Sequence, residues 1–289
     1  MYRISEKKVL NPSVIHLKVE APLVARAAKP GQFVILRPDE NSERIPLTIA
    51  GSSKESGEIE IIFQRVGATT ERLARLGEGD FIADLVGPLG KPTELSGISR
   101  ALIVGGGVGC AIALPIARAL HDSGCEVISV IGFRGSELVI LEDEFRAVSS
   151  ALTVMTDDGS HGREGNVTLP VAEMLKAGEH FDMIIAIGPL VMMKYVTKTA
   201  EPYGVPVTVS MNPIMIDGTG MCGGCRLTLI KDGKRVTKFA CVDGPDFNGY
   251  EVDFDEAMQR SRMYFDFERH AHSEECNLYK KEVGENGEA

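Results

Sequence analysis

The sequence predicts a mixed β and α/β fold in three successive parts. Short alternating strands fill the first third, long apolar strands alternate with helical patterns in the middle, and a glycine- and cysteine-rich segment follows. These patterns predict an N-terminal antiparallel β-barrel over 1–98, a Rossmann-like parallel α/β domain over 99–212, and a small cysteine-containing domain with a C-terminal helix over 213–289. A chain of 289 residues is long enough for two or three domains and a sizeable core.

The barrel prediction rests on period-two alternation. In VIHLKVEA, the side chains of Ile15, Leu17 and Val19 alternate with polar ones, which is typical of a strand with one buried face. Further strands are expected in QFVILRP, LTIAG, EIEIIFQRV and FIADLVGP. The segments between them, such as GSSKESGE and GPLGKP, are rich in turn-forming residues, and short strands separated in this way indicate a small barrel.

The middle part has the pattern of a parallel sheet. Apolar runs alternate with helical patterns, as expected for strands joined by crossover helices, and the runs are ALIVGGG, EVISVIGF, LTVMTDDG, MIIAIGP and PVTVSMNP. In the last part, RLTLIKDGKRVTKFAC predicts a hairpin that turns at KDGK. VDFDEAMQRSRMYFDFERH has helical spacing, and the tail KKEVGENGEA is expected to be solvated.

Composition narrows the class of protein. The formal net charge of −10 argues against a general nucleic-acid binder and is expected to serve solubility. No apolar run is long enough to span a membrane, and the start MYRISEKKVL lacks the apolar region of a signal peptide. Six cysteines are too few for a disulfide framework. We therefore expect a cytoplasmic protein.

The cysteine segment indicates an iron–sulfur cluster. Its spacing is Asp217-x4-Cys222-x2-Cys225-x15-Cys241, which matches the plant-type [2Fe–2S] pattern except that Asp stands at the first ligand position. The run DGTGMCGGC also supplies glycines, which let backbone N–H groups approach the sulfides closely. The same CxxC suits zinc or ordinary thiols, but the chain has no second CxxC and its nearest downstream histidine is His270.

A glycine-rich turn follows the first apolar strand of the middle part. Small residues between a strand and a helix allow a pyrophosphate to approach the helix N-terminus, where free N–H groups favour anions. The run departs from G-x-G-x-x-G because Cys110 occupies the last position, so a tight turn without a ligand is the alternative. The candidate dinucleotide contacts here are Gly105, Gly106, Gly107, Val108 and Gly109.

Later strands of the same sheet end in further polar or tight turns. Ligands of open α/β sheets gather at the carboxyl ends of the strands, so these turns are expected to form one site with the glycine run. Arg134 is placed to meet a 2′-phosphate, although an ion pair with Glu137 or Glu142 is the favoured alternative. The candidate contacts at these ends are Arg134, Asp157, Asp158, Gly188 and Pro189.

Two weaker motifs lie in the barrel. Arg44-Ile-Pro-Leu-Thr places a cation and a hydroxyl at the start of a strand, and arginine is suited to phosphate. Gly67-Ala-Thr-Thr70 offers backbone N–H groups and a hydroxyl to a pyrophosphate. Either motif alone is as consistent with a solvated surface. The candidate residues are Arg44, Pro46, Leu47, Thr48, Gly67 and Thr70.

The order of these motifs resembles the ferredoxin–NADP reductase superfamily. With the cysteine segment C-terminal, the chain is similar to the branch of dihydroorotate dehydrogenase electron-transfer subunits. Longer strings resemble the small (alpha) subunits of NADH-dependent ferredoxin:NADP+ oxidoreductases, a group also described as sulfide dehydrogenase subunits. These strings are ERIPLTIA, VGPLGKP, GFRGSELVILEDEF, AIGPLVMMK and NPIMIDGTGMCGGCR.

The resemblance implies three cofactors and a partner. FAD would be bound by Arg44 near its pyrophosphate, by Thr48 near the isoalloxazine, and by the 67–70 turn. NAD(H) would lie on the glycine run and the other strand ends, and the cluster would be a [2Fe–2S] centre with one Asp and three Cys ligands. No catalytic acid or base is expected, since hydride transfer depends on alignment. The partner would be a larger FAD/[4Fe–4S] flavoprotein similar to the glutamate synthase small subunit, through which ferredoxin and NADP(H) would react in electron bifurcation.

The chain departs from the superfamily pattern at two positions. Pro46 replaces the superfamily's aromatic residue, and Ile187 replaces a cysteine that often precedes the Gly-Pro turn. The C-terminal helix carries the apolar residues Met258, Met263, Tyr264, Phe265 and Phe267. Some of them are expected in the core, and the remainder are expected to form part of a surface for the partner.

Three further functions compete with electron bifurcation. The first is the electron-transfer subunit of a dihydroorotate dehydrogenase, which would have Cys at position 217. The second is a sulfide dehydrogenase, and the third is a non-catalytic zinc- or nucleotide-binding regulator. Flavin and iron absorption in the purified protein would exclude the regulator.

Overall fold

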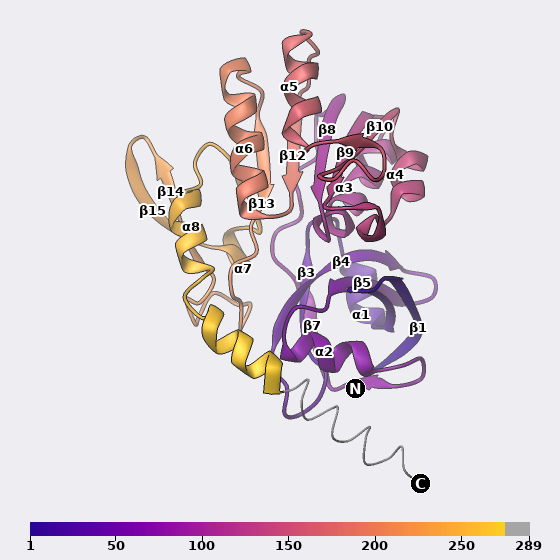
Figure 1. The fold of residues 1–289 in the computed structure, drawn as a ribbon. Coiled ribbons are helices and arrows are strands. Elements are labelled where there is room, and N and C mark those ends of the chain that lie inside the picture. The colour runs from indigo at the N-terminus through magenta and orange to yellow at the C-terminus, as the bar shows by residue number, and fades with distance from the viewer. Residues whose placement is uncertain (275–289) are drawn as a thin grey trace.

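The computed structural model describes residues 1–274, so the tail KKEVGENGEA lies outside the described residues. The N-terminal part is a seven-stranded antiparallel sheet that curls into a nearly closed barrel, in the order β6-β1-β2-β5-β4-β3-β7 (Figure 1). Its strands are β1 (Tyr2–Asn11), β2 (Val14–Glu20), β3 (Phe33–Arg37), β4 (Ile45–Ser53), β5 (Glu58–Gln64), β6 (Phe81–Ile82) and β7 (Asp84–Leu89). Helices α1 (Pro22–Ala27) and α2 (Ala68–Arg75) lie in its connections.

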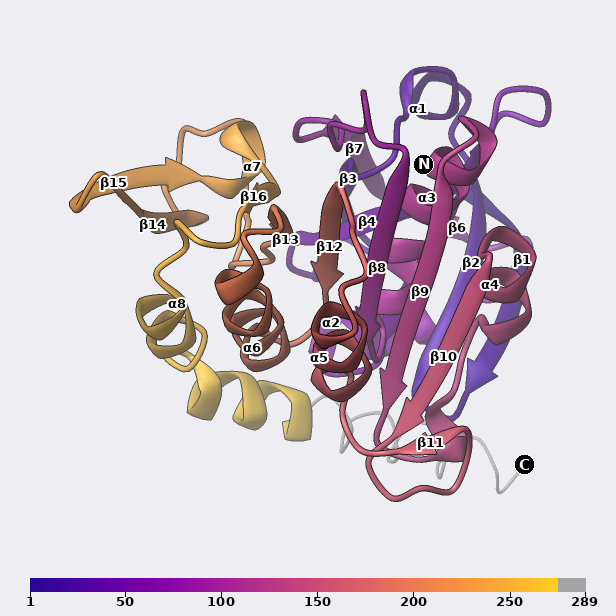
Figure 2. The same ribbon diagram turned by 90° about the horizontal axis from the view of Figure 1, so that it is seen from above.

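The sheet of the middle part has the order β11-β10-β9-β8-β12-β13-β16, and all its pairings are parallel except that of β16. The strands are β8 (Arg100–Gly106), β9 (Glu126–Phe133), β10 (Ala151–Thr156), β11 (Arg163–Glu164), β12 (Met183–Ile187), β13 (Val207–Ser210) and β16 (Asp246–Asn248). The helices are α3 (Gly109–Asp122), α4 (Glu142–Val148), α5 (Thr168–Lys176) and α6 (Leu190–Ala200), with 3-10 turns at Ser136–Leu138 and Glu201–Tyr203. Helices α5 and α6 cover one face of the sheet, and α3 and α4 cover the other (Figure 2).

The barrel joins the sheet through apolar packing on both faces. Val14, Ala50 and Ile62 of the barrel belong to the same buried cluster as α3 and α4. On the other face, Phe33 and Ile35 of β3 belong to the cluster that contains α5, α6 and the cysteine segment. These contacts exclude water from two interfaces, which fixes the barrel against the sheet.

The cysteine segment packs at the β13 edge of the sheet. It contains the hairpin of β14 (Arg226–Lys231) and β15 (Lys234–Phe239), helix α7 (Ala240–Asp243), and β16, which pairs with β13. The sequence pattern missed this last strand, because three residues are too few to show a period. It also missed β1, the first strand of the barrel.

The C-terminal segment differs from the single helix expected over 252–270. Helix α8 (Phe254–Arg260) ends, a turn occupies 261–264, and a second helix runs from 265 to the last described residue, 274. This second helix reaches the barrel near α2 (Figure 1), where His272 Nε2 lies 3.5 Å from Glu71 Oε1. Within residues 1–274, no helix combines the length and the apolar composition needed to cross a membrane.

Candidate cofactor sites

The hairpin brings two of the four proposed cluster ligands together. Strands β14 and β15 pair Arg226 with Phe239, and the Ala240 N–H donates to the Cys225 carbonyl at 3.1 Å. The Cys225 and Cys241 side chains are buried, with their sulfurs 3.1 Å apart and no disulfide between them. Sequence-distant cysteines are thus juxtaposed by strand register, as the KDGK turn predicted.

Backbone N–H groups of the glycine-rich loop point at the cysteine sulfurs. The Gly224 N–H donates to Cys222 Sγ at 3.4 Å, and Gly220 donates to the Cys241 sulfur. Burial and the neighbouring Cys225 thiol raise the pKa of Cys241 to about 12 when no metal is bound. Because a metal ligand must be a thiolate, N–H donors of this kind favour the ligating form of the loop.

Asp217 is held as a carboxylate at the start of the same loop. Its Oδ2 accepts hydrogen bonds from Thr219 Oγ1 at 2.6 Å, from the Thr219 N–H at 3.0 Å and from the Met221 N–H at 3.3 Å. The hydrogen bonds from Thr219 are the main reason that the pKa of Asp217 is lowered. A hard anionic ligand is therefore available beside exposed Cys222.

This donor set fits an iron–sulfur cluster. It offers three thiols and one ionised carboxylate from a loop with N–H groups aimed at sulfur. No three His, Cys, Asp or Glu side chains of residues 1–274 are grouped to hold a single metal ion. The assignment therefore rests on the spacing, on the N–H donors and on the family described below.

The cluster loop packs directly on the barrel. A Cβ added at Gly218 would lie 2.7 Å from both Ile35 Cδ1 on β3 and Leu89 Cδ1 on β7, so a side chain at position 218 would require these two side chains to shift. Ile35 is the register partner of Pro46 on β4. Since opposed residues of an antiparallel pair point to the same face, the loop beside Asp217 lies against the face of the barrel that carries the proposed flavin motif.

The flavin motif is presented at the start of β4. Arg44 precedes the strand and is exposed, while Pro46, Leu47 and Thr48 are half-buried on it. Within the described chain, Arg44 makes no ion pair with an acidic side chain. The arginine is thus available to a phosphate.

The second barrel motif forms the start of α2. Thr70 Oγ1 accepts hydrogen bonds from the N–H groups of Val66 (3.0 Å) and Gly67 (2.9 Å), and it donates to the Gly67 carbonyl at 2.8 Å. This hydroxyl is engaged in closing the turn. The N–H groups of the first helical turn have no carbonyl partner earlier in the helix, so they are what the turn offers to an anion.

The glycine run lies at the carboxyl edge of the sheet, beside the Gly188-Pro189 turn. A Cβ at Gly109 would lie 2.4 Å from the Ile187 carbonyl oxygen, and one at Gly188 would lie 3.1 Å from the Gly106 nitrogen. Gly107 has φ +55° and open space around it. The two turns therefore touch each other through glycines, with Val108 capping α3, and the predicted juxtaposition of these strand ends is observed.

The ends of β9 and β10 carry mostly acidic groups. Asp157 and Asp158 are exposed, and Ser160 donates to Asp158 Oδ1 at 2.6 Å, which lowers the pKa of Asp158. A Cβ at Gly135 would lie 2.8 Å from Asp158 Oδ2 and 2.6 Å from Glu137 Oε2. Two carboxylates thus flank the backbone at the end of β9.

Arg134 does not form the ion pair that the sequence favoured. Glu142 instead binds Arg146 at 2.6 Å and His161 at 2.7 Å, because Arg146 is one helical turn away on α4. In the described part of the chain, Arg134 is an exposed cation without a salt bridge, next to the candidate dinucleotide edge.

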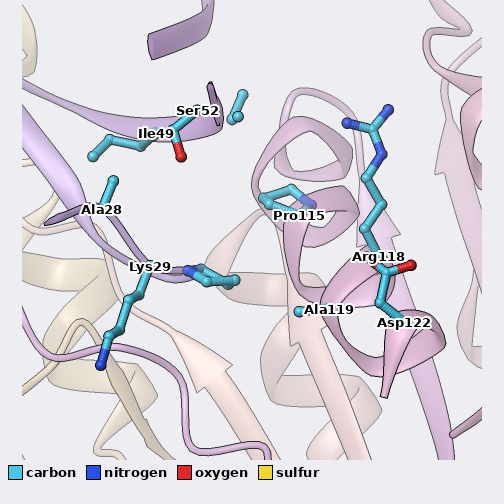
Figure 3. Close-up of a pocket in the computed structure, with 11 residues that line it drawn as sticks. Ala28, Lys29, Ile49, Ser52, Pro115, Arg118, Ala119 and Asp122 are labelled. Atoms are coloured by element: carbon cyan, nitrogen blue, oxygen red, sulfur yellow. The ribbon is translucent and has the colours of Figure 1, made fainter. Parts of the chain in front are cut away.

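One hollow in the described residues lies away from these sites. It has a volume of about 250 Å³ and lies between the second half of β4 and the C-terminal half of α3 (Figure 3). Lys29 and Arg118 point away from each other there, so no pair of cations converges on a phosphate. The cofactor sites are therefore assigned from the residue types and hydrogen-bond donors that they contain, and not from the size of a hollow.

Ile35 and Leu89 were missed by sequence reasoning. They are ordinary apolar strand residues, and only the packing of the cluster loop on the barrel gives them a role. A strand pattern shows that a side chain is buried but not what it is buried against.

Comparison with known proteins decides the family. Residues 212–253 match the iron-sulfur cluster binding domain of dihydroorotate dehydrogenase B. A dihydroorotate dehydrogenase B electron transfer subunit homolog of Thermotoga maritima is 45% identical over 266 residues, which cover 92% of each chain. The chain belongs to the family of dihydroorotate dehydrogenase B electron transfer subunits.

Further members and a solved structure agree with this family. The dihydroorotate dehydrogenase B electron transfer subunit of Streptococcus pneumoniae R6 is 32% identical over 86% of this chain and 97% of its own. A chain from the structure of an NADH-dependent reduced ferredoxin-NADP oxidoreductase, studied for flavin-based electron bifurcation, superimposes with a TM-score of 0.87. The two sequences are 42% identical, and the match covers 95% of this chain and 97% of the solved chain.

Membership in the electron transfer subunit family settles several sequence predictions. The three-part fold and the iron–sulfur function of the cysteine segment are confirmed, and the protein is an oxidoreductase subunit of a heteromeric electron-transfer enzyme. The alternative prediction of a non-catalytic zinc- or nucleotide-binding regulator is therefore wrong. The residue-level contacts and the domain boundaries at 98 and 212 stay predictions.

Proposed function

We propose that this subunit passes electrons from NAD(H) through FAD and a [2Fe–2S] cluster to a partner flavoprotein. When bound, FAD takes a hydride, with its two electrons, from NADH and leaves NAD+, whereas the cluster carries one electron at a time. The observation that carries the proposal is the contact of Gly218 with Ile35 and Leu89, because it puts the cluster loop on the barrel face beside the flavin motif.

The barrel residues bind and orient FAD. Arg44 neutralises the pyrophosphate, the first turn of α2 after Gly67 donates N–H groups to it, and Thr70 holds that turn in shape. Thr48 and Pro46 line the isoalloxazine side of β4, whereas Leu47 between them packs its side chain against the barrel core and offers its backbone. Pro46 offers an apolar ring in place of an aromatic one.

The sheet edge binds the nicotinamide nucleotide. Gly105, Gly106, Gly107 and Gly109 let its pyrophosphate approach α3, while Asp157, Gly188 and Pro189 surround the rest. The carboxylates of Glu137 and Asp158 at the end of β9 disfavour a 2′-phosphate more than the single cation of Arg134 favours one, so we assign NADH. Faster reduction of the flavin by NADPH than by NADH in a stopped-flow experiment would contradict this assignment.

The surface around the cluster loop is suited to a partner. Met221 is 88% exposed next to Cys222, and Ile216 is 55% exposed next to Asp217. The expected C-terminal face is also exposed: Met263, Tyr264, Phe265 and Phe267 all lie at the surface, whereas Met258 is half-buried. Exposed patches of apolar side chains mark protein interfaces. A partner that docks at the loop would lie close to the cluster, so electrons would leave the cluster over a short distance.

The partner is a larger FAD/[4Fe–4S] flavoprotein, and the complex performs NADH-dependent ferredoxin:NADP+ bifurcation. Asp217 supports this choice over a dihydroorotate dehydrogenase, for which we expect cysteine at that position. The likeness to the ferredoxin-NADP oxidoreductase chain supports it as well. Tagged chain purified from its own host should bring down one such flavoprotein; a dihydroorotate-oxidising subunit instead would favour the second function.

Metal analysis and one substitution test the cluster assignment. The purified chain should contain about two iron and two sulfide per chain, as a [2Fe–2S] centre requires. Asp217→Cys should retain the cluster but change its absorption spectrum and potential, because thiolate is a softer donor than carboxylate. Stoichiometric zinc without iron, or an unchanged spectrum and potential in the variant, would refute the assignment.

A further inference from the structure

Asp246 lies where the three parts of the chain meet. It begins β16, opposite Ser210 of β13, and its Oδ2 accepts a hydrogen bond of 2.6 Å from Thr93 Oγ1. Thr93 is buried in the segment that leads from the barrel to the sheet. The other oxygen of this carboxyl group, Oδ1, is buried and has no hydrogen-bond partner among the described residues. One side chain thus joins the cysteine segment, the sheet and the connection to the barrel.

Pro30 and Gly31 of the barrel make room for the hydrogen bond between Thr93 and Asp246. The Thr93 N–H donates to the Pro30 carbonyl at 3.0 Å. A Cβ at Gly31 would lie 2.2 Å from Thr93 Oγ1 and 3.3 Å from Asp246 Oδ2, and Gly31 has φ +85°. Glycine at position 31 therefore leaves the room through which the Thr93 hydroxyl reaches Asp246.

Both sides of the junction lead directly to the proposed electron path. On the barrel side the chain continues into β3, whose Ile35 packs against Gly218 of the cluster loop. On the other side the Lys91 N–H donates to the Gly244 carbonyl at 2.7 Å, and Gly244 follows Cys241 by three residues. The junction consequently fixes the segment with the last cluster ligand to the barrel.

We propose that Asp246 is a positioning residue for electron transfer between the flavin and the cluster. It acts through Thr93, by fixing the distance between the barrel and the cysteine segment, and this inference rests on the proposed function. Electron transfer slows steeply as donor and acceptor separate. Hydride transfer does not depend on this junction, because Val14, Ala50 and Ile62 pack the barrel against α3 without contribution from Asp246 or Thr93.

Two disruptive and two conservative variants of the cofactor-loaded chain test the proposal. Asp246→Ala removes the acceptor and Thr93→Val removes the donor, whereas Asp246→Asn and Thr93→Ser keep an acceptor and a donor of similar size. One addition of NADH in an anaerobic stopped-flow experiment resolves flavin reduction from the transfer of one electron to the cluster. Flavin reduction should be unchanged in all four variants. Cluster reduction should slow by a few-fold in the disruptive pair, because a wider gap between flavin and cluster lowers the electron-transfer rate, and it should be restored in the conservative pair.

Hydrogen exchange supplies a readout that does not depend on turnover. The amides of Lys91 and Thr93 should exchange faster in Asp246→Ala and Thr93→Val than in Asp246→Asn and Thr93→Ser. Unchanged cluster reduction in the disruptive pair, with iron and flavin intact, would overturn this inference alone, as would equal slowing of both steps. If Asp246→Ala does not fold, Thr93→Val decides. Failure of NADH to reduce the flavin of the unmodified chain would instead overturn the proposed function.

Discussion

Arg44 is the residue on which flavin binding should depend most. Its guanidinium is exposed at the start of β4 and makes no salt bridge to a described acidic residue. Arg44→Ala should weaken FAD binding tenfold or more, because a charge-assisted phosphate contact contributes about 1.5–3 kcal/mol. Fluorescence titration of the flavin-free protein measures this change. Lys54→Ala, which removes an exposed cation just beyond the other end of β4, is the matched control and should bind FAD normally; equal affinity in both variants would remove Arg44 from the site.

Asp246 also predicts a pH dependence of stability. Burial raises the pKa of Asp246, and the hydrogen bond from Thr93 offsets this only in part. The folded state therefore holds the proton more tightly than the unfolded state, so stability falls as the pH rises from the ordinary aspartate range through the raised pKa. The slope within that window is about 1.4 kcal/mol per pH unit.

Asp246→Asn should remove this decline. The free energy of unfolding of both proteins can be measured with urea between pH 4 and pH 8, roughly the range where proteins are most stable. The difference between the two curves then isolates the effect of Asp246. Asp246 lines a second hollow together with charged groups that are present in both proteins, namely Lys91, Lys231, Lys238, Asp243 and Glu251. A difference that is constant with pH would mean that Asp246 does not titrate in this window.

Single residues were predictable where chemistry fixes their type and spacing. Asp217 and the three cysteines after it could be proposed as ligands because cluster loops require thiolates at fixed intervals. The free state of Arg134 could not be predicted, since it depends on Glu142 choosing Arg146 and His161. Asp246 carries no motif, and its role depends on Thr93, which lies 153 positions away in the sequence.

Among the elements, strands with a clear apolar pattern were predictable, whereas the short edge strand β16 and the largely polar β1 were not. The five expected strands of the sheet and the 226–241 hairpin are present. β16 was missed because its pairing with β13 is a tertiary contact, and the break at 261–264 was missed because it contains neither Gly nor Pro.

The cluster loop gives the sharpest prediction at the scale of elements. Gly218 has φ +80°, and its missing Cβ makes room for Ile35 and Leu89 at 2.7 Å. Gly218→Ala should therefore cost more than the roughly 1–2 kcal/mol of a left-handed residue, because the Ile35 and Leu89 side chains must also shift to admit the new methyl group. Urea unfolding together with iron content measures both consequences.

A matched control separates strain from packing. Gly233, in the β14–β15 turn, has φ +72° and no atom within 4 Å of an added Cβ. Gly233→Ala should show the conformational cost alone and keep its iron. Equal destabilisation and equal iron content in the two variants would show that the contact between loop and barrel does not matter.

At the scale of the whole molecule, the barrel contacts the rest of the chain at two interfaces. It meets the sheet through an apolar interface at α3, and it meets the cysteine segment at Gly218 and Thr93, where electron transfer is proposed. Sequence order predicted the three parts. It did not predict that the last of them adds a strand to the sheet and returns a helix to the barrel at Glu71.

The central claim is that electrons from NADH reach the cluster through the flavin of the same chain. Anaerobic freeze-quench EPR of the purified chain after addition of NADH tests it most directly. We predict that flavin absorption is lost first and that the signal of a reduced [2Fe–2S] cluster then appears, without any partner protein. A chain whose flavin is reduced by NADH while its iron gives no such signal would contradict the claim.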